Sequence, residues 1–207
     1  MRFAVFSDVH GNLLALDACL ADLESQGGAD GVAVAGDLCL DGPKPKKVLL
    51  RLEEIGAACI RGNKDRYVFD DAVAETLTAT ERAQIAWTRR EIGERWLAWL
   101  RELPFALRIG EDEAIAFGHL HLPYVRMWRG KLLVNVASVG LPKDGDPRAC
   151  YAIFTERECG WEVKHRRVAF DVKKVATQLS DCGIPESTEL IATLRRHRYK
   201  RLKSAIP

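Results

Sequence analysis

The sequence predicts an α/β protein (α+β in its second half), with a parallel sheet built first and short strands added later. Three observations support this. Apolar runs alternate with helical patterns over residues 2–60, each run stops at a glycine or polar residue, and short apolar runs follow from residue 105. Alternating strands and helices are typical of a parallel sheet with right-handed crossovers. The 207 residues fit a single domain, 1–207, with a full core.

The first half is expected to alternate three strands with two helices. The strands are predicted at Arg2–Ser7, Gly31–Ala35 and Ala57–Ile60, and the helices at Asn12–Gln26 and Pro43–Ile55. Leucines at helical spacing give the first helix an apolar face, and a pair of glycines ends it. Two more helices are predicted within Thr78–Leu103. Their tryptophans stand at helical spacing, which favours a place in the core over a binding platform.

The second half is expected to hold short strands followed by two helices. The strands are predicted at Phe105–Ile109, Ala114–Phe117, Lys131–Asn135, Ala149–Thr155 and Trp161–Phe170. Glu158-Cys159-Gly160 indicates a hairpin tip. The helices are predicted at Asp171–Cys182 and from Pro185 to about Arg198, ahead of a basic tail of about residues 195–207.

Charge and composition indicate the expected partners and location of the protein. The formal net charge of +2 gives no field that favours nucleic acid or an anionic membrane as a default partner. The basic tail is interpreted as a solvated segment, with nucleic-acid binding as the weaker alternative. No apolar stretch reaches the roughly 20 residues that span a bilayer, and the chain opens on a strand rather than on a leader. We therefore expect a cytoplasmic protein. None of the six cysteines forms a C-x-x-C pair, which predicts reduced, buried thiols.

Side chains able to bind metal stand at the ends of successive predicted strands. They are Asp8 and His10, then Asp37, then Asn63, then His119 and His121. Open α/β sheets bind ligands beyond the carboxyl ends of their strands. A mixture of oxygen donors and imidazoles suits Mn²⁺, Fe or Zn²⁺ better than Ca²⁺. Six donors exceed the need of one ion and would suit two ions about 3.5–4 Å apart. We expect one or two divalent metal ions per chain.

These residues carry a resemblance to a known family. Asp8-Val9-His10-Gly11-Asn12, Gly36-Asp37, Gly62-Asn63-x-Asp65 and Gly118-His119-x-His121 resemble the motifs of the calcineurin-like metallophosphoesterases, in particular their small bacterial and archaeal phosphodiesterase-like branch. The segments 134–140 and 144–149 resemble that branch as well, so the likeness covers nearly the whole chain. The resemblance implies a four-layer α-β-β-α sandwich, with two mixed sheets face to face and helices outside.

The resemblance also implies roles for individual residues. One metal would be held by Asp8, His10, Asp37 and His121, and the second by Asp37, Asn63 and His119, with Asp37 bridging. Asn12 and Asn63 are expected to contact the substrate phosphate, which the start of the first helix also favours.

The sequence departs from the family pattern at two places. Lys64 stands before Asp65 where the family usually has a catalytic histidine. We expect Lys64 and Asp65 to serve the leaving group, and a solvated surface lysine is the alternative. The second departure is larger, because residues 111–117 run straight into Gly118-His119. The separate His-Gly strand end of the family is missing, and with it one histidine of the second metal site.

The function that the resemblance implies is hydrolysis of phosphate esters by a metal-activated hydroxide, as a phosphodiesterase or a phosphatase. The expected substrate is a small phosphoester or a nucleotide. The alternative is a degenerate, weakly active family member that acts as a nucleotide- or protein-binding module. The sequence leaves the oligomeric state open, although the short antiparallel strands of the second half would suit pairing in a homodimer.

Overall fold

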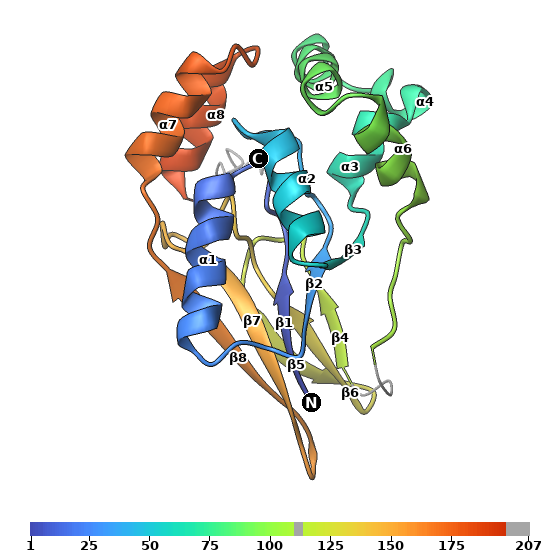
Figure 1. The fold of residues 1–207 in the computed structure, drawn as a ribbon, viewed down its shortest axis with the longest axis vertical. Helices are drawn as coiled ribbons and strands as arrows, with labels where there is room; N and C mark the ends of the chain where they lie inside the picture. The colour runs from blue at the N-terminus through green and yellow to red at the C-terminus, as the bar shows by residue number, and fades with distance from the viewer. Residues whose placement is uncertain (110–113, 198–207) are drawn as a thin grey trace, which may run out of the picture.

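The computed structural model describes residues 1–109 and 114–197 (Figure 1). The first half alternates as β1 (Arg2–Phe6), α1 (Leu13–Ser25), β2 (Gly31–Ala35), α2 (Pro45–Glu54) and β3 (Ala58–Ile60). Four helices follow: α3 (Asn63–Phe69), α4 (Asp71–Ala74), α5 (Ala79–Ile92) and α6 (Glu94–Glu102). The second half contains β4 (Ala114–Phe117), β5 (Tyr124–Trp128), β6 (Lys131–Asn135), β7 (Ala149–Arg157), β8 (Gly160–Val168), α7 (Val172–Asp181) and α8 (Ser187–Arg196).

The strands form two mixed sheets. The larger has the order β3-β2-β1-β7-β8, in which β1, β2 and β3 are parallel and β7 runs antiparallel to β1. The smaller has the order β4-β6-β5, with β4 parallel and β5 antiparallel to β6. The predicted class, two mixed sheets flanked by helices, is confirmed. Both sheets combine a parallel part with an antiparallel edge, which is common in large mixed folds.

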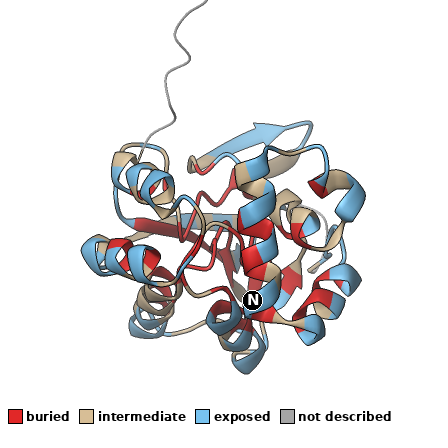
Figure 2. Ribbon diagram, turned by 90° about the horizontal axis from the view of Figure 1, so that it is seen from above, coloured by how far each residue is buried: buried red, intermediate tan, exposed pale blue. Residues whose placement is uncertain are grey.

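The larger sheet is covered on both faces, which explains the continuous apolar runs in its strands. Ala4 and Phe6 of β1 face a core shared with α1 and α2. Val5, between them, faces the smaller sheet and packs near Val134 of β6. Buried residues accordingly concentrate at the centre of the molecule, whereas the outer faces of the helices are exposed (Figure 2).

A group of helices stands beyond the carboxyl ends of β1, β2 and β3 (Figure 1). Trp87 of α5 packs with Val175 and Leu179 of α7 and with Leu194 of α8. Trp96 of α6 is buried as well, as predicted for the tryptophans of this region. These helices are therefore placed where they can wall a site at the strand ends.

Several predicted elements need correction. Phe105–Ile109 is not a strand, because the segment pairs with neither sheet and Phe105 is 78% exposed. Strand β5 was not predicted, since an arginine interrupts its apolar run. The short helices α3 and α4 were also not predicted.

The cysteine and tail predictions hold only in part. All six cysteines are free thiols, as predicted, but Cys159 is exposed because it lies in the two-residue turn between β7 and β8. The basic tail begins in the last turn of α8, and its part from residue 198 on lies outside the described residues. Within the parts of the chain that the structure describes, no helix has the length and apolar character needed to cross a membrane.

Candidate metal centre

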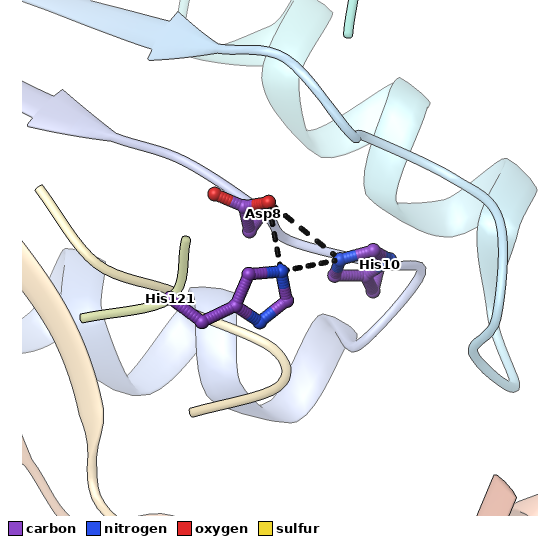
Figure 3. A group of neighbouring side chains, drawn as sticks. All are labelled: Asp8, His10 and His121. Atoms are coloured by element: carbon purple, nitrogen blue, oxygen red, sulfur yellow. Dashed lines mark hydrogen bonds and ion pairs between the residues drawn. The ribbon is translucent and has the colours of Figure 1, made fainter. Parts of the chain in front are cut away.

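Three buried side chains from two distant parts of the chain converge at the carboxyl end of β1. The ligand atoms of Asp8, His10 and His121 all lie within 4.8 Å of one another (Figure 3). His121 Nε2 is 3.0 Å and His10 Nε2 is 3.8 Å from Asp8 Oδ1. The two Nε2 atoms are 3.4 Å apart. One carboxylate and two imidazoles at these separations are the donor set that borderline divalent metals prefer.

The hydrogen bonds of the two rings fix which nitrogen faces the centre. The Nδ1 of His10 donates to the carbonyl oxygen of Leu40, 3.1 Å away, and the Nδ1 of His121 donates to the carbonyl oxygen of Leu141. In a neutral ring with Nδ1 protonated, Nε2 presents its lone pair. Asp8 Oδ1 is buried and accepts no hydrogen bond. Three electron-pair donors therefore point at one another, an arrangement that a bound cation would satisfy.

The second oxygen of Asp8 is held in place by the protein. Ser7 Oγ donates to Asp8 Oδ2 at 2.7 Å, and the backbone N–H of His119 donates to the same oxygen at 2.9 Å. Such contacts orient a ligating carboxylate and leave its other oxygen to the metal. Ser7 was not singled out in the sequence, because a serine at a strand end has no signature of its own.

The site residues share an unusual backbone conformation. Positive φ angles of 49° to 78° occur at Asp8, His10, Asp37, Asp41, His119 and His121. Residues other than glycine rarely adopt this left-handed region, and each costs of order 1–3 kcal/mol. These residues lie in the segments that follow β1, β2 and β4. Strain of this kind concentrates at functional sites.

Two glycines let the strand ends approach one another. A Cβ added at Gly62 would lie 2.1 Å from Asp37 Oδ1, and one added at Gly118 would lie 1.8 Å from Ser7 Oγ. Both positions therefore need glycine for steric reasons. The turn after β6 completes the support, because the Ser138 hydroxyl donates to the carbonyl oxygen of Asp8 at 2.8 Å.

Asp37, Asn63 and His119 lie beside the group of three but are not part of it. Asp37 is 5% exposed, and its Oδ1 accepts a hydrogen bond from the backbone N–H of Lys64 at 2.9 Å. The Nδ1 of His119 donates to Asn63 Oδ1 at 2.9 Å. All three residues line the cavity that His10 and His121 also line. The structure thus brings the six predicted ligands to one end of the sheet.

Burial and neighbouring charges have opposing effects on the pKa values of residues at the centre. Burial alone would raise the pKa of Asp8, but contacts from His10 and His121 hold that pKa below its ordinary value. Burial lowers the pKa of His121. It also raises the pKa of Asp37, where the charge of Asp8 adds to the effect and His10 opposes it. A site that concentrates buried carboxylates in this way stabilises positive charge.

Lys64 lines the cavity and is only partly exposed. Its Nζ lies 3.1 Å from Asp41 Oδ2 and lines the same cavity as the histidines. Burial alone would lower the pKa of Lys64, but the charges of Asp41 and Asp37 raise it. The same Asp41 oxygen lies 3.5 Å from His10 Nδ1. The sequence did not identify Asp41 as a site residue. The only local indication was that an acidic residue precedes Gly42-Pro43.

Asp65 and Asn12 make contacts of a different kind. Asp65 is fully buried and accepts hydrogen bonds from the backbone N–H groups of Leu38 and Gly62, at 2.8 and 2.9 Å. Burial raises its pKa to about 7. Asn12 caps α1 through the N–H of Ala15, and its Nδ2 donates to Gly140 O at 3.0 Å. Both side chains are thus engaged in holding loops together.

The cavity over the centre has a volume of about 610 Å³. Its floor is formed by the strand-end residues, and its walls come from α5, α7 and α8. Polar side chains of α5 and the segment before it, among them Thr78 and Gln84, line it together with Lys143. The lining combines cations, hydrogen-bonding groups and carboxylates, which suits a charged, polar ligand. The carboxylates are those of Asp37, Asp41, Glu81 and Glu189.

The sequence that contains this site is similar to known proteins. Residues 1–158 match the model of the calcineurin-like phosphoesterase superfamily domain. The phosphodiesterase YfcE of Escherichia coli K12 is 30% identical over 159 residues, which cover 71% of this chain and 84% of the relative. The uncharacterised protein MJ0912 of Methanocaldococcus jannaschii is 25% identical, covering 88% of this chain and 93% of the relative. That alignment spans 230 residues, more than the 207 of this chain, so the relative has residues without a counterpart here.

Solved structures share the fold. A metallophosphoesterase from Sphaerobacter thermophilus superposes with a TM-score of 0.80 at 24% identity, over 95% of this chain and 99% of the other. The hypothetical protein PH1004 from Pyrococcus horikoshii reaches a TM-score of 0.85 at 18% identity, over 96% and 99%. At these identities the likeness establishes the architecture, including the two mixed sheets.

Proposed function

The chain belongs to the calcineurin-like phosphoesterase superfamily, and we propose that the metal-dependent phosphoesterase activity of this family resides at the Asp8–His10–His121 centre. The observation that carries the proposal is the convergence of one unpaired carboxylate oxygen and two imidazole nitrogens in a buried site. A shared divalent cation would bind all three groups at once and is the fitting occupant.

The proposed ligands are those expected from the sequence. Asp8, His10 and His121 would hold one ion, with Asp37 completing its shell, and Asp37, Asn63 and His119 would hold a second. A bound divalent ion supplies Lewis-acid stabilisation of phosphate charge and a more acidic water molecule. The chemistry of the donors favours Mn²⁺, Fe or Zn²⁺.

Lys64 is proposed to bind the substrate phosphate and to serve the leaving group. Asp41 holds the lysine ammonium at 3.1 Å, in the cavity that also contains the metal ligands. An ammonium in this place neutralises phosphate charge and can pass a proton to the departing alkoxide. For Asp65 we propose a positioning role in place of the expected catalytic one, because its oxygens bind backbone N–H groups of two loops. For Asn12 we likewise propose a positioning role.

The second ion would have fewer protein ligands than the first. The expected absence of a His-Gly segment would remove one histidine. We propose that the second ion binds more weakly than the first and is the one lost on dilution.

A phosphodiester is the proposed substrate class. The relative YfcE is a phosphodiesterase, and the polar cavity with its two lysines suits a small phosphoester or a nucleotide. The named relatives favour an enzyme over the binding-only alternative. A cytoplasmic location stays a prediction.

Hydrolysis of bis(p-nitrophenyl) phosphate in the presence of Mn²⁺ tests the proposal. His121→Gln and Asp37→Ala should each lower kcat/KM by roughly 10²-fold or more, since each removes a proposed ligand. His165→Gln is the matched control, because His165 is a partly buried histidine that contacts the carbonyl oxygen of Asn135 and lines neither the metal centre nor its cavity. Equal rates for wild type, His121→Gln and Asp37→Ala would refute the proposal.

A further inference from the structure

A second cavity borders the proposed ligands of the second ion. It has a volume of about 1240 Å³ and lies between β1, β2 and β3 of the larger sheet and β4 of the smaller one. Asp37, Asn63 and His119 line both this cavity and the polar one described above. The two cavities therefore meet at the proposed ligands of the second ion.

The amino-acid sequence explains why this space is open. Sheets that pack face to face stand about 10 Å apart, and the gap is normally filled by side chains from both. On β2 and β4 several of the positions that line the cavity are small: Ala33 and Ala35 on β2, and Ala114 and Ala116 on β4. These short side chains leave space beside the two strands, whereas Val34 belongs to the helix-side core.

The lining of this cavity, which we call the inter-sheet cavity, is mainly apolar. Aromatic rings from separate elements contribute to it, among them Phe3, Phe69, Phe117 and Trp161. On its rim Leu107 is 45% and Ile115 is 44% exposed. Large apolar side chains left open around a concave space indicate a ligand site.

Resting on the proposed function, we infer that the substrate is a phosphodiester with one polar and one apolar substituent. The phosphate lies at the centre, the polar substituent lies with Lys64 and Lys143, and an alkyl or aryl group enters the inter-sheet cavity. Hydrolysis forms a bond between the water oxygen and phosphorus, breaks one P–O ester bond and leaves a proton on the departing alcohol. The lining residues that the two cavities share, among them Asp37 and His119, support this assignment over an unrelated docking surface.

The experiment compares p-nitrophenyl phosphodiesters of methanol, butanol and octanol with the full-length protein and Mn²⁺. Transfer of each methylene into an apolar site corresponds to a gain of up to roughly fourfold, so kcat/KM should rise steeply from methyl to butyl. Ala33→Leu fills the cavity from β2 and should remove most of the gain for the octyl ester while leaving the methyl ester within about twofold.

A second variant covers the case in which Ala33→Leu fails to fold. Leu107→Ser acts on the rim and should lower kcat/KM for the octyl ester alone. Val125→Ser is its matched control, because Val125 is 46% exposed on β5 and lines neither cavity. Binding of octylphosphonate, measured by calorimetry against methylphosphonate, gives a readout that needs no turnover and should show the same dependence on Ala33 and Leu107.

The outcomes separate the two proposals. Hydrolysis with equal kcat/KM for all three esters, together with equal binding of both phosphonates, overturns the apolar substituent and leaves the phosphoesterase. Failure to hydrolyse any of the esters overturns the proposed function and the substrate class with it. A dimer that Leu107→Ser dissociates, without any preference for the octyl ester, makes the inter-sheet cavity an interface between copies and also overturns the inference.

Discussion

The Nε2 atoms of His10 and His121 lie 3.4 Å apart, although 111 residues separate them and neither ring donates a proton to the other. Each Nδ1 donates to a backbone carbonyl, so the two lone pairs face each other beside Asp8 Oδ1. Asp8, His10 and His121 are buried and have a left-handed backbone conformation, which is costly for residues other than glycine. A bound cation explains why the fold keeps these metal-binding groups together.

We expect Lys64 to contribute to catalysis, but less effectively than a histidine at the same position would. Lys64→Met should lower kcat by roughly 10²-fold, the usual contribution of a positioned acid. Lys64→His should raise kcat at neutral pH, because an imidazolium gives up its proton more readily than an ammonium. Lys44→Met is the control, since Lys44 contacts neither Asp41 nor the cavity. A Lys64→Met enzyme with the wild-type kcat would show that this lysine serves neither phosphate nor leaving group.

Gly118→Ala is expected to damage the centre and the fold together. The new Cβ would lie 1.8 Å from Ser7 Oγ and 2.2 Å from Asp8 Oδ2, so the strand ends must separate. We expect a loss of about 1–3 kcal/mol in the free energy of unfolding, measured by urea denaturation, and weaker metal binding. Gly56→Ala is the control, because a Cβ added at Gly56 has no atom within 4 Å. Only the strain of alanine at a φ of +63° should lower the free energy of unfolding, by about 1 kcal/mol. Metal affinity should be unchanged in that control, and a Gly118→Ala protein that keeps both properties would contradict the geometry.

Asp22 is expected to stabilise the fold in a pH-dependent way. It accepts two hydrogen bonds from Arg166 and one from Tyr151, which join α1 to β8 and β7. Arg166 lowers the pKa of Asp22, so its contribution is full above the unfolded pKa of about 3.9 and is lost as the pH falls through the folded value.

Asp22→Asn should therefore lower the free energy of unfolding by about 1–3 kcal/mol at pH 7 and by much less below about pH 3. Asp17→Asn, on the same helix, removes a more exposed ion pair with Arg51 and should cost less than about 1 kcal/mol. Urea denaturation at both pH values measures the difference. If Asp22→Asn lowered the free energy of unfolding equally at both pH values, the carboxylate charge would not be the source of the loss.

The periodic parts of the fold were predictable from the sequence. Strands β2, β4 and β6 lie at the predicted residues, because each is an apolar run bounded by glycine or polar residues. The segment Phe105–Ile109 has the apolar content of a strand, but its side chains line the inter-sheet cavity and its backbone does not pair in a sheet. Apolar content alone cannot tell a strand from a segment that faces a ligand site.

The metal ligands were predictable because residues able to bind metal recur at the strand ends. The residues that hold site side chains in place were not predictable. Asp8, His10 and His121 could be read from the sequence as a group. The roles of Asp41 and Ser7 depend on contacts across the fold, at 3.1 Å to Lys64 and 2.7 Å to Asp8, that no local pattern announces. The openness of the inter-sheet cavity depends on small side chains of β2 and β4 that line it, which only the packing of the sheets reveals.

Metal content per chain is the most direct test of the central claim. The protein is equilibrated with Mn²⁺, passed through a desalting column and analysed for metal, beside Asp8→Asn, His119→Ala and His165→Gln. The account predicts at least one ion in wild type and His165→Gln, loss of the tighter ion in Asp8→Asn, and loss of only the weaker ion in His119→Ala. Wild type and Asp8→Asn proteins with the same metal content, or a wild type that binds none at millimolar Mn²⁺, would contradict it.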